Sequence, residues 1–176
     1  MRKLEYFRMD LDFYMVDRWY LGRPVGLSGT LGKHFITPKY IGSDEVFEMP
    51  VKKPGPELRF TIGNFGTPVV EESLAFAIQN MCGPDVELIN AKIDSKNKYY
   101  ILNVVSLIDC IDKQKSELSY KKDGSILAMP KLSIMKEAAW PHHMFKVGTD
   151  ISIIVSGEIR DLICSTGSHM VIFRDV

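Results

Sequence analysis

Glycine and proline recur every few residues between Gly22 and Pro56, and this spacing excludes a long helix from the N-terminal third of the chain. The residues within that stretch are Pro24, Gly26, Gly29, Gly32, Pro38, Gly42, Pro50, Pro54 and Gly55. Short strands and turns remain as the structures that it can form. We therefore predict a Gly/Pro-rich β region over residues 1–56 and an α+β core over residues 57–176, packed together as one domain.

The other two thirds of the chain alternate between helical and strand patterns. Val70–Met81 has apolar residues spaced as on one face of a helix. Ser156–Cys164 predicts a second short helix, with Ser156 as its N-cap. Tyr99–Ile111 is the most apolar segment, and its Tyr, Ile and Val residues predict a long, largely buried central strand. The expected fold class is α+β, with a mainly antiparallel β-sheet and two or more short helices.

A shift of 85 residues superimposes the apolar positions of one segment on those of another. The superimposed apolar pairs are Phe60 with Phe145, Ile62 with Val147, Val70 with Val155, Leu74 with Ile159 and Ile78 with Ile163. After a one-residue adjustment, Val86 falls on Met170. The pattern indicates an internally duplicated strand–helix–strand unit. The alternative is chance, because glycine commonly follows a helix and aligns unrelated units equally well.

Charge and cysteine usage bear on the class of partner. The 22 Lys and Arg residues balance 22 Asp and Glu residues, so the basic surplus typical of direct nucleic-acid binding is absent. Charges interrupt residues 1–10, unlike a secretory signal. No stretch approaches the roughly 18 consecutive apolar residues of a membrane helix. The three cysteines are widely spaced, which suits a reducing compartment. We therefore expect a cytoplasmic protein that binds neither nucleic acid nor membrane.

Motifs for catalysis and for cofactors are absent from the sequence. It contains no glycine-rich phosphate loop and no Cys or His pair with zinc-ligand spacing. Asp109 and Asp112 end the apolar run, but a strand places residues three apart on opposite faces, which favours turn capping over a shared acid–base site. We predict no catalytic residue, no metal and no cofactor. Two alternatives stay open: an enzyme whose site gathers Asp109, Asp112 and His142 from a distance, or a ligand-binding regulatory module.

The order of several short motifs resembles a family of bacterial immunity proteins. This family is the one numbered eleven among those of polymorphic toxin systems, formerly described as a domain of unknown function. The resemblance covers most of the chain and is strongest over residues 60–176. The motifs that carry it are the run Tyr99–Asp112 with Ser116, then Met144–Val147, Ile153–Ser156, Gly167 and Val171–Phe173.

The resemblance implies an antitoxin that neutralises a cognate bacterial toxin by direct stoichiometric binding, without catalysis. Many such toxins are nucleases, and acidic side chains would complement the basic cleft of a nuclease. Interface anchors are commonly aromatic. The candidate partner-binding residues are Trp19, Tyr20, Asp44, Glu45, Glu48, Asp109, Asp112, Trp140 and His142. The oligomeric state and the contact surface are left open.

Overall fold

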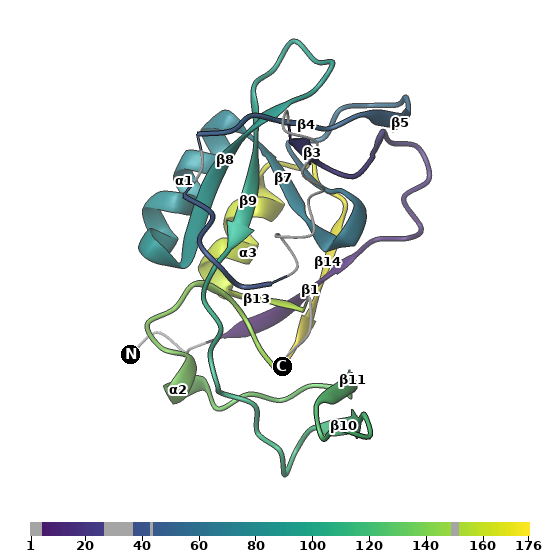
Figure 1. Cartoon of the computed structure of the whole chain (residues 1–176). Helices are drawn as coiled ribbons and strands as arrows, with labels where there is room; N and C mark the ends of the chain where they lie inside the picture. The colour runs from purple at the N-terminus through teal and green to yellow at the C-terminus, as the bar shows by residue number, and fades with distance from the viewer. Residues whose placement is uncertain (1–4, 27–36, 43, 149–151) are drawn as a thin grey trace.

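A computed structural model describes residues 5–26, 37–42, 44–148 and 152–176 of the chain (Figure 1). The strands are β1 (Tyr6–Leu11), β2 (Tyr20–Leu21), β3 (Val25–Gly26), β4 (Phe47–Glu48), β5 (Val51–Lys53), β6 (Phe60–Ile62), β7 (Pro68–Glu71), β8 (Val86–Lys92), β9 (Tyr99–Val104), β10 (Glu117–Tyr120), β11 (Ile126–Lys131), β12 (Met144–Lys146), β13 (Ile153–Ser156) and β14 (Val171–Asp175). The helices are α1 (Glu72–Cys82), α2 (Lys136–Ala139) and α3 (Gly157–Ser165), and the 3-10 turns are η2 (Asn64–Gly66) and η3 (Gly83–Asp85).

A six-stranded sheet has the strand order β3-β4-β8-β9-β7-β6, with β9 in its interior. All six residues of β9 are buried, which confirms a buried central strand. The predicted extension of this strand to Ile111 is wrong, because the continuous ladder ends at Val104. From Val105 to Ile111, single bridges are the only strand pairing within the described part of the chain, between Leu107 and Lys146 and between Ile111 and Ile134.

A four-stranded antiparallel sheet has the order β12-β13-β1-β14. Its interior strand β1 comes from the N-terminal region, and Figure 1 shows it running beside the C-terminal strand β14. This pairing supports the predicted packing of residues 1–56 with residues 57–176 as one domain, which stays a prediction. Two further sheets are small, pairing β2 with β5 and β10 with β11.

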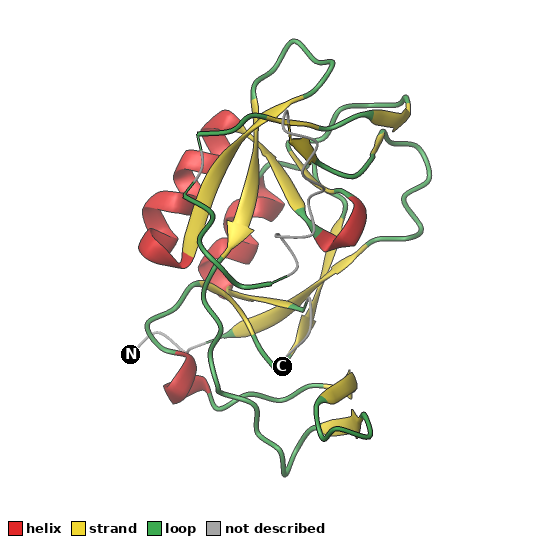
Figure 2. Cartoon of the chain, in the orientation of Figure 1, coloured by secondary structure: helices red, strands yellow, loops and turns green. Residues whose placement is uncertain are grey.

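The helices confirm the α+β class and correct one predicted boundary. Ser156 caps α3 as predicted, because its hydroxyl accepts a hydrogen bond from the N–H of Ile159. Helix α1 begins at Glu72 rather than at Val70, because Val70 pairs with Tyr100 in the sheet. In Figure 2 strands dominate the middle of the molecule, whereas loops form much of its upper and lower ends. In the described part of the chain, no helix is long and apolar enough to cross a membrane.

The order β6-β7-α1-β8 recurs as β12-β13-α3-β14. Of the ten apolar residues superimposed by the 85-residue shift, nine are buried and Ile62 is half-buried. Both sets of strands also pair in the same way: Val70 lies opposite Tyr100, and Val155 lies opposite Phe7. Strand β1 therefore takes, in the second unit, the place that β9 takes in the first.

The register of the last strand in each unit corrects the alignment of its residues. Leu88 lies opposite Leu102 in the first unit, and Phe173 lies opposite Met9 in the second. Because these pairs match at a shift of 85, Val86 corresponds to Val171 and not to Met170. The one-residue difference is confined to the helix ends, where Gly83 and Gly167 both have positive φ angles that glycine adopts without strain.

One apolar core joins the two units. It combines side chains of the two large sheets with side chains of α1 and α3. The helix residues include Leu74 and Ile78 of α1 and Ile159 and Ile163 of α3. A second core underlies β2 and β4, and a third underlies α2 and the β10–β11 hairpin. The two ends of the molecule therefore rest on separate apolar clusters.

Candidate partner-binding site

Three segments far apart in sequence meet at the carboxylate of Asp85, in the turn before β8. His142 Nδ1 donates to this carboxylate and lies 2.9 Å from each of its two oxygens. Ser106, two residues beyond the end of β9, donates its hydroxyl to Oδ1 at 2.6 Å. The Asp85 side chain is largely buried, whereas the His142 ring is about one-third exposed. We call Asp85, Ser106 and His142 the Asp85 cluster. It joins the turn before β8 and the residues after β9 to the segment before β12.

Backbone hydrogen bonds extend this attachment along two neighbouring segments. The N–H of Lys146 donates to the carbonyl of Ser106 at 2.8 Å, and the N–H of Ile108 donates to the carbonyl of Lys146 at 2.9 Å. At the start of α2, the N–H of Met135 donates to the carbonyl of Cys110 at 2.7 Å. Residues 106–110 and 135–146 are therefore held against each other by backbone hydrogen bonds. Lys146 is itself buried, and this burial lowers the pKa of its ammonium group to about 8.

Large apolar side chains are exposed on these two segments. Leu107 is 51% exposed, Met135 is 46% exposed and Trp140 is 57% exposed. Together with Asp109 and His142 they form what we call the α2 surface. The Trp140 ring lies edge-on to the ring of His143, with 6.4 Å between centroids. The α2 surface thus carries exposed apolar and polar side chains on two segments that backbone hydrogen bonds join.

The two aspartates at the end of the apolar run have different surroundings. Asp109 is exposed. Asp112 Oδ1 accepts hydrogen bonds from the backbone N–H groups of Gln114 and Lys115, and its Oδ2 lies 3.1 Å from Lys115 Nζ. The hydrogen bond with Lys115, aided by these backbone donors, lowers the pKa of the Asp112 carboxyl. Asp112 is therefore a turn-capping residue, as its sequence context favoured.

The residues that define the enzyme alternative are not joined to one another. His142 bonds to Asp85, and no hydrogen bond within the described ranges connects it to Asp109 or Asp112. Nor does the described part of the chain contain three His, Cys, Asp or Glu side chains grouped as metal ligands. Sequence reasoning missed Asp85, the partner of His142, and Ser106, which donates to the same carboxylate. Their distance along the chain leaves no local pattern that identifies them.

The two aromatic candidates of the N-terminal region lie away from the α2 surface, in and over the second core. Trp19 is 2% exposed and packs against Tyr99, with 5.3 Å between ring centroids. Tyr20 is half-buried, and the guanidinium of Arg18 lies 3.8 Å from its ring centroid. Trp19 therefore has almost no side-chain surface to offer a partner in this structure, whereas Tyr20 retains some.

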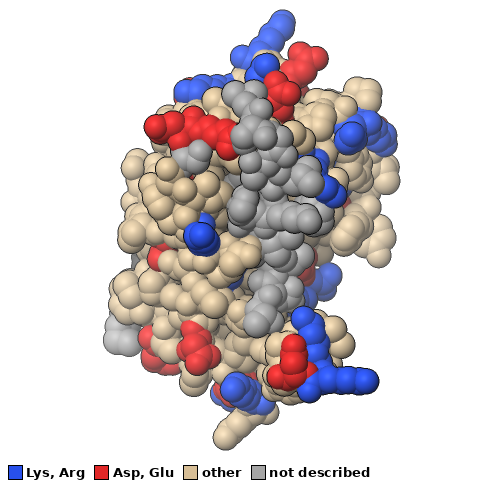
Figure 3. Space-filling model, in the orientation of Figure 1, with Lys and Arg blue, Asp and Glu red and all other residues tan. Residues whose placement is uncertain are grey.

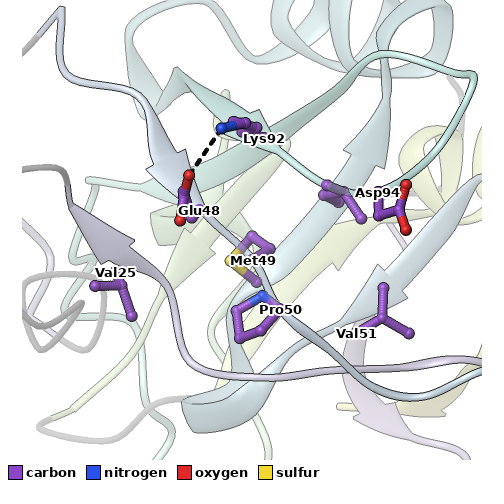
Figure 4. A pocket seen from close by; sticks show the side chains of 8 residues that line it. Val25, Glu48, Met49, Pro50, Val51, Lys92 and Asp94 are labelled. Carbon is purple, nitrogen blue, oxygen red and sulfur yellow. Dashed lines mark hydrogen bonds and ion pairs between the residues drawn. The ribbon is translucent and has the colours of Figure 1, made fainter.

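The acidic candidates Asp44 and Glu45 precede β4, and Glu48 lies in it. Figure 1 shows β4 near the upper end of the molecule. Glu48 forms a 2.9 Å ion pair with Lys92 of β8. This pair borders an open surface pocket of about 470 Å³. The remaining lining residues are Val25, Met49, Pro50, Val51, Ile93 and Asp94. Figure 4 shows Glu48 and Lys92 pointing toward each other on one side, with Val25 and Val51 on opposite sides.

The predicted residues thus fall in two places rather than one. Asp109, Trp140 and His142 gather at the α2 surface, with Asp112 in the adjoining turn, whereas the other candidates lie toward the opposite end. Figure 3 shows acidic and basic side chains interspersed among uncharged ones on the face that it presents, without a dominant field of one sign. The α2 surface is therefore characterised by its exposed apolar side chains rather than by charge, although Phe13, Tyr14 and Val16 in the N-terminal region are more exposed still.

A comparison with protein families gives one match. The model of an immunity protein family, Imm11, matches residues 84–176, which is just over half of the chain. The matched part includes the whole Asp85 cluster and the whole α2 surface. The candidates from Trp19 to Glu48 lie outside it. A search of curated proteins finds no match.

Proposed function

The chain belongs to the Imm11 immunity protein family, and from that membership we propose that it neutralises a cognate bacterial toxin by direct, stoichiometric binding in the cytoplasm. An immunity role follows from the family itself. The mechanism of binding without catalysis is our proposal, supported by the structural roles of His142, which bonds to Asp85, and of Asp112, which caps a turn.

The α2 surface is the contact site that the geometry favours. The observation that carries this choice is the exposure of Leu107, Met135 and Trp140 on one hydrogen-bonded frame inside the family-matched segment. Burying half-exposed apolar side chains contributes about 25 cal/mol per Å² of apolar surface. Large aromatic residues on a rigid support carry a disproportionate share of binding energy. Trp140 is therefore the proposed central anchor, with Asp109 and His142 at its polar border.

A nuclease is the toxin class to examine first. Its basic substrate cleft would attract Asp109 on the α2 surface, and Asp44 and Glu45 would add longer-range attraction. Because acids and bases are interspersed on the protein, we expect such steering to be modest. If apolar anchoring dominates, the association rate falls only slightly with added salt. Trp140 then contributes more to the binding free energy than the carboxylates do.

Protection of living cells tests the proposal. The C-terminal domain encoded by the adjacent upstream gene is expressed in a bacterial host with or without this protein, and survivors are counted. We expect killing that the protein relieves, and loss of protection in the double variant Leu107→Asp/Trp140→Ala. The control is Leu127→Asp, which alters a leucine of the β10–β11 hairpin that is 60% exposed, against 51% for Leu107. Full protection by the double variant excludes the α2 surface.

Titration of the purified toxin separates binding from catalysis. A binding inhibitor leaves residual toxin activity that falls in proportion to the amount of protein added and ends at a fixed molar ratio. An enzyme that inactivates the toxin turns over, so with time it abolishes toxin activity at a molar ratio of protein to toxin far below that value. The second result would favour the enzyme alternative, and Asp109→Asn, Asp112→Asn and His142→Ala would then be assayed for loss of that activity.

A further inference from the structure

Strands β8 and β14 hold equivalent places in the two copies of the duplicated unit, yet their outer edges differ. A short strand covers the outer edge of β8: Phe47 of β4 pairs in parallel with Ala91, and the N–H of Met49 donates to the carbonyl of Lys92 at 2.9 Å. In the described part of the chain, β14 is the last strand of its sheet. Among the described residues, the same position is thus filled by an extended segment in one copy and holds no strand in the other.

The hydrogen bonds between β1 and β14 show which main-chain groups of β14 face outward. Asp12 donates its N–H to the carbonyl of Met170 at 2.9 Å, so this pair faces inward. In an antiparallel ladder, inward and outward groups alternate along each strand. Arg174 therefore directs its main-chain groups toward β1, whereas Phe173 and Asp175 direct their N–H and C=O groups away from the sheet.

Just before β14 begins, the chain pairs with a strand of the other large sheet. The N–H of Phe60 in β6 donates to the carbonyl of Ser168 at 3.1 Å, and Phe60 forms a parallel bridge with His169. At its other end, β14 leads to Val176, which packs on the third core together with Ile108. The open part of the edge therefore runs from a strand-pairing site toward the cluster beneath the α2 surface.

We propose that the open edge of β14 receives an extended segment of the toxin, which adds a strand to the four-stranded sheet. This inference rests on the proposed function and extends its interface from side chains to main-chain hydrogen bonds. Adding a strand to a sheet edge is an established mode of peptide recognition. The segment would accept hydrogen bonds from the N–H groups of Phe173 and Asp175 and donate to their carbonyl groups.

Charge argues against a second copy of this chain as the occupant. Two-fold pairing of β14 strands centred on Phe173 would place the two Arg174 side chains at diagonal positions, roughly 7–8 Å apart at their backbones. Arg174 and Asp175 are both exposed charged residues of β14, although Arg174 is partly compensated by Asp10 at 2.8 Å. Charged residues on an edge strand are a common means of preventing self-association.

Amide hydrogen exchange, followed by NMR, tests the proposal on the intact protein. In the free protein we expect fast exchange at Phe173 and Asp175 and slow exchange at Ile172 and Arg174. Addition of the purified toxin domain should slow exchange at Phe173 and Asp175 by at least tenfold. Unchanged exchange at both residues in a protein that demonstrably binds the toxin overturns the proposal. Slowing that depends on protein concentration without toxin identifies a second copy as the occupant, which also overturns it.

A proline substitution isolates the main-chain contribution. Phe173→Pro removes an outward N–H, a position at which an edge strand tolerates proline, and Phe173→Ala controls for loss of the ring. We expect Phe173→Pro to bind the toxin about tenfold more weakly than Phe173→Ala, as one lost hydrogen bond of about 1.4 kcal/mol implies. Equal affinities of the two variants contradict the proposal. Absence of toxin binding by the unaltered protein instead contradicts the proposed function, so the two failures are distinguishable.

Discussion

His142 Nδ1 lies 2.9 Å from both carboxylate oxygens of Asp85, although the two residues are 57 positions apart in the sequence. The contact attaches the segment that carries Trp140 to the turn in front of β8. Because Ser106 donates to the same carboxylate, one largely buried side chain orders three segments. The α2 surface consequently depends on Asp85, which itself contributes no exposed anchor.

We predict that Asp85→Ala lowers the free energy of unfolding by about 1–3 kcal/mol, because the variant leaves the Ser106 hydroxyl and the His142 ring without their acceptor. Urea unfolding monitored by circular dichroism measures this change. Asp109→Ala is the control, since Asp109 is exposed and surface substitutions of this kind usually change stability by less than about 0.5 kcal/mol. Equal stabilities of the two variants would show that the Asp85 cluster does not support the fold.

The two tryptophans should differ sharply in their effect on stability. Trp19→Ala removes a fully buried ring and is expected to cost about 3–5 kcal/mol. Trp140→Ala removes a ring that is 57% exposed, so we expect a cost below about 1 kcal/mol. Thermal and urea unfolding of both variants provide the test. A large loss of stability in Trp140→Ala would assign that ring to the core and remove it from the α2 surface.

Thiol reactivity should separate the three cysteines. Burial raises the pKa of Cys82 to about 12 and that of Cys110 to about 11, so both remain protonated thiols at pH 8. Cys164 is exposed, and thiolate formation and access together govern reactivity. We expect one rapidly reacting thiol per folded chain with a chromogenic disulfide reagent, and none in Cys164→Ser. Rapid reaction of two thiols would contradict the burial of Cys82 or Cys110.

Lys146 should produce a pH-dependent difference in stability. Burial lowers the pKa of Lys146 from 10.5 to about 8 in the folded protein. Between these values the unfolded chain binds the proton and the folded protein does not, so the contribution of Lys146 to stability rises with pH. Below pH 8 both states are protonated, and the cost of burying the charge is fully present.

The comparison is between the unaltered protein and Lys146→Met, because raised pKa values of Tyr6, Tyr99 and the buried cysteines affect both equally. We expect the stability of the unaltered protein, relative to Lys146→Met, to increase from pH 8 to pH 10.5 and to stay constant from pH 6 to pH 7.5. Urea unfolding over this pH series measures the difference. A difference that is independent of pH would show that Lys146 keeps its ordinary pKa.

The elements that were predictable from sequence depend on local signals. Helix α3 was located correctly because Ser156 is a good N-cap and apolar residues follow at helical spacing. The duplicated unit was visible because its strands and helices bury equivalent positions. Its completion by β1 was not visible, since pairing between β1 and β14 joins opposite ends of the chain and leaves no local pattern.

The errors arose where a distant residue determines the structure. The apolar run after β9 continues through Val105, Leu107 and Ile108 without a turn signal. Its ladder ends there because Ser106 binds Asp85 and the following residues meet β12 instead. Aromatic character alone likewise does not distinguish Trp19 in the core from Trp140 at the surface, because burial depends on the tertiary fold.

Calorimetric titration of the purified toxin domain with this protein and with Trp140→Ala tests the central claim most directly. We predict a complex of fixed stoichiometry for the unaltered protein, and at least tenfold weaker binding for Trp140→Ala, as expected of a central aromatic anchor. Leu127→Ala, on the hairpin, should bind as the unaltered protein does. Protection of cells without a measurable complex, or equal affinity of Trp140→Ala, would contradict neutralisation through the α2 surface.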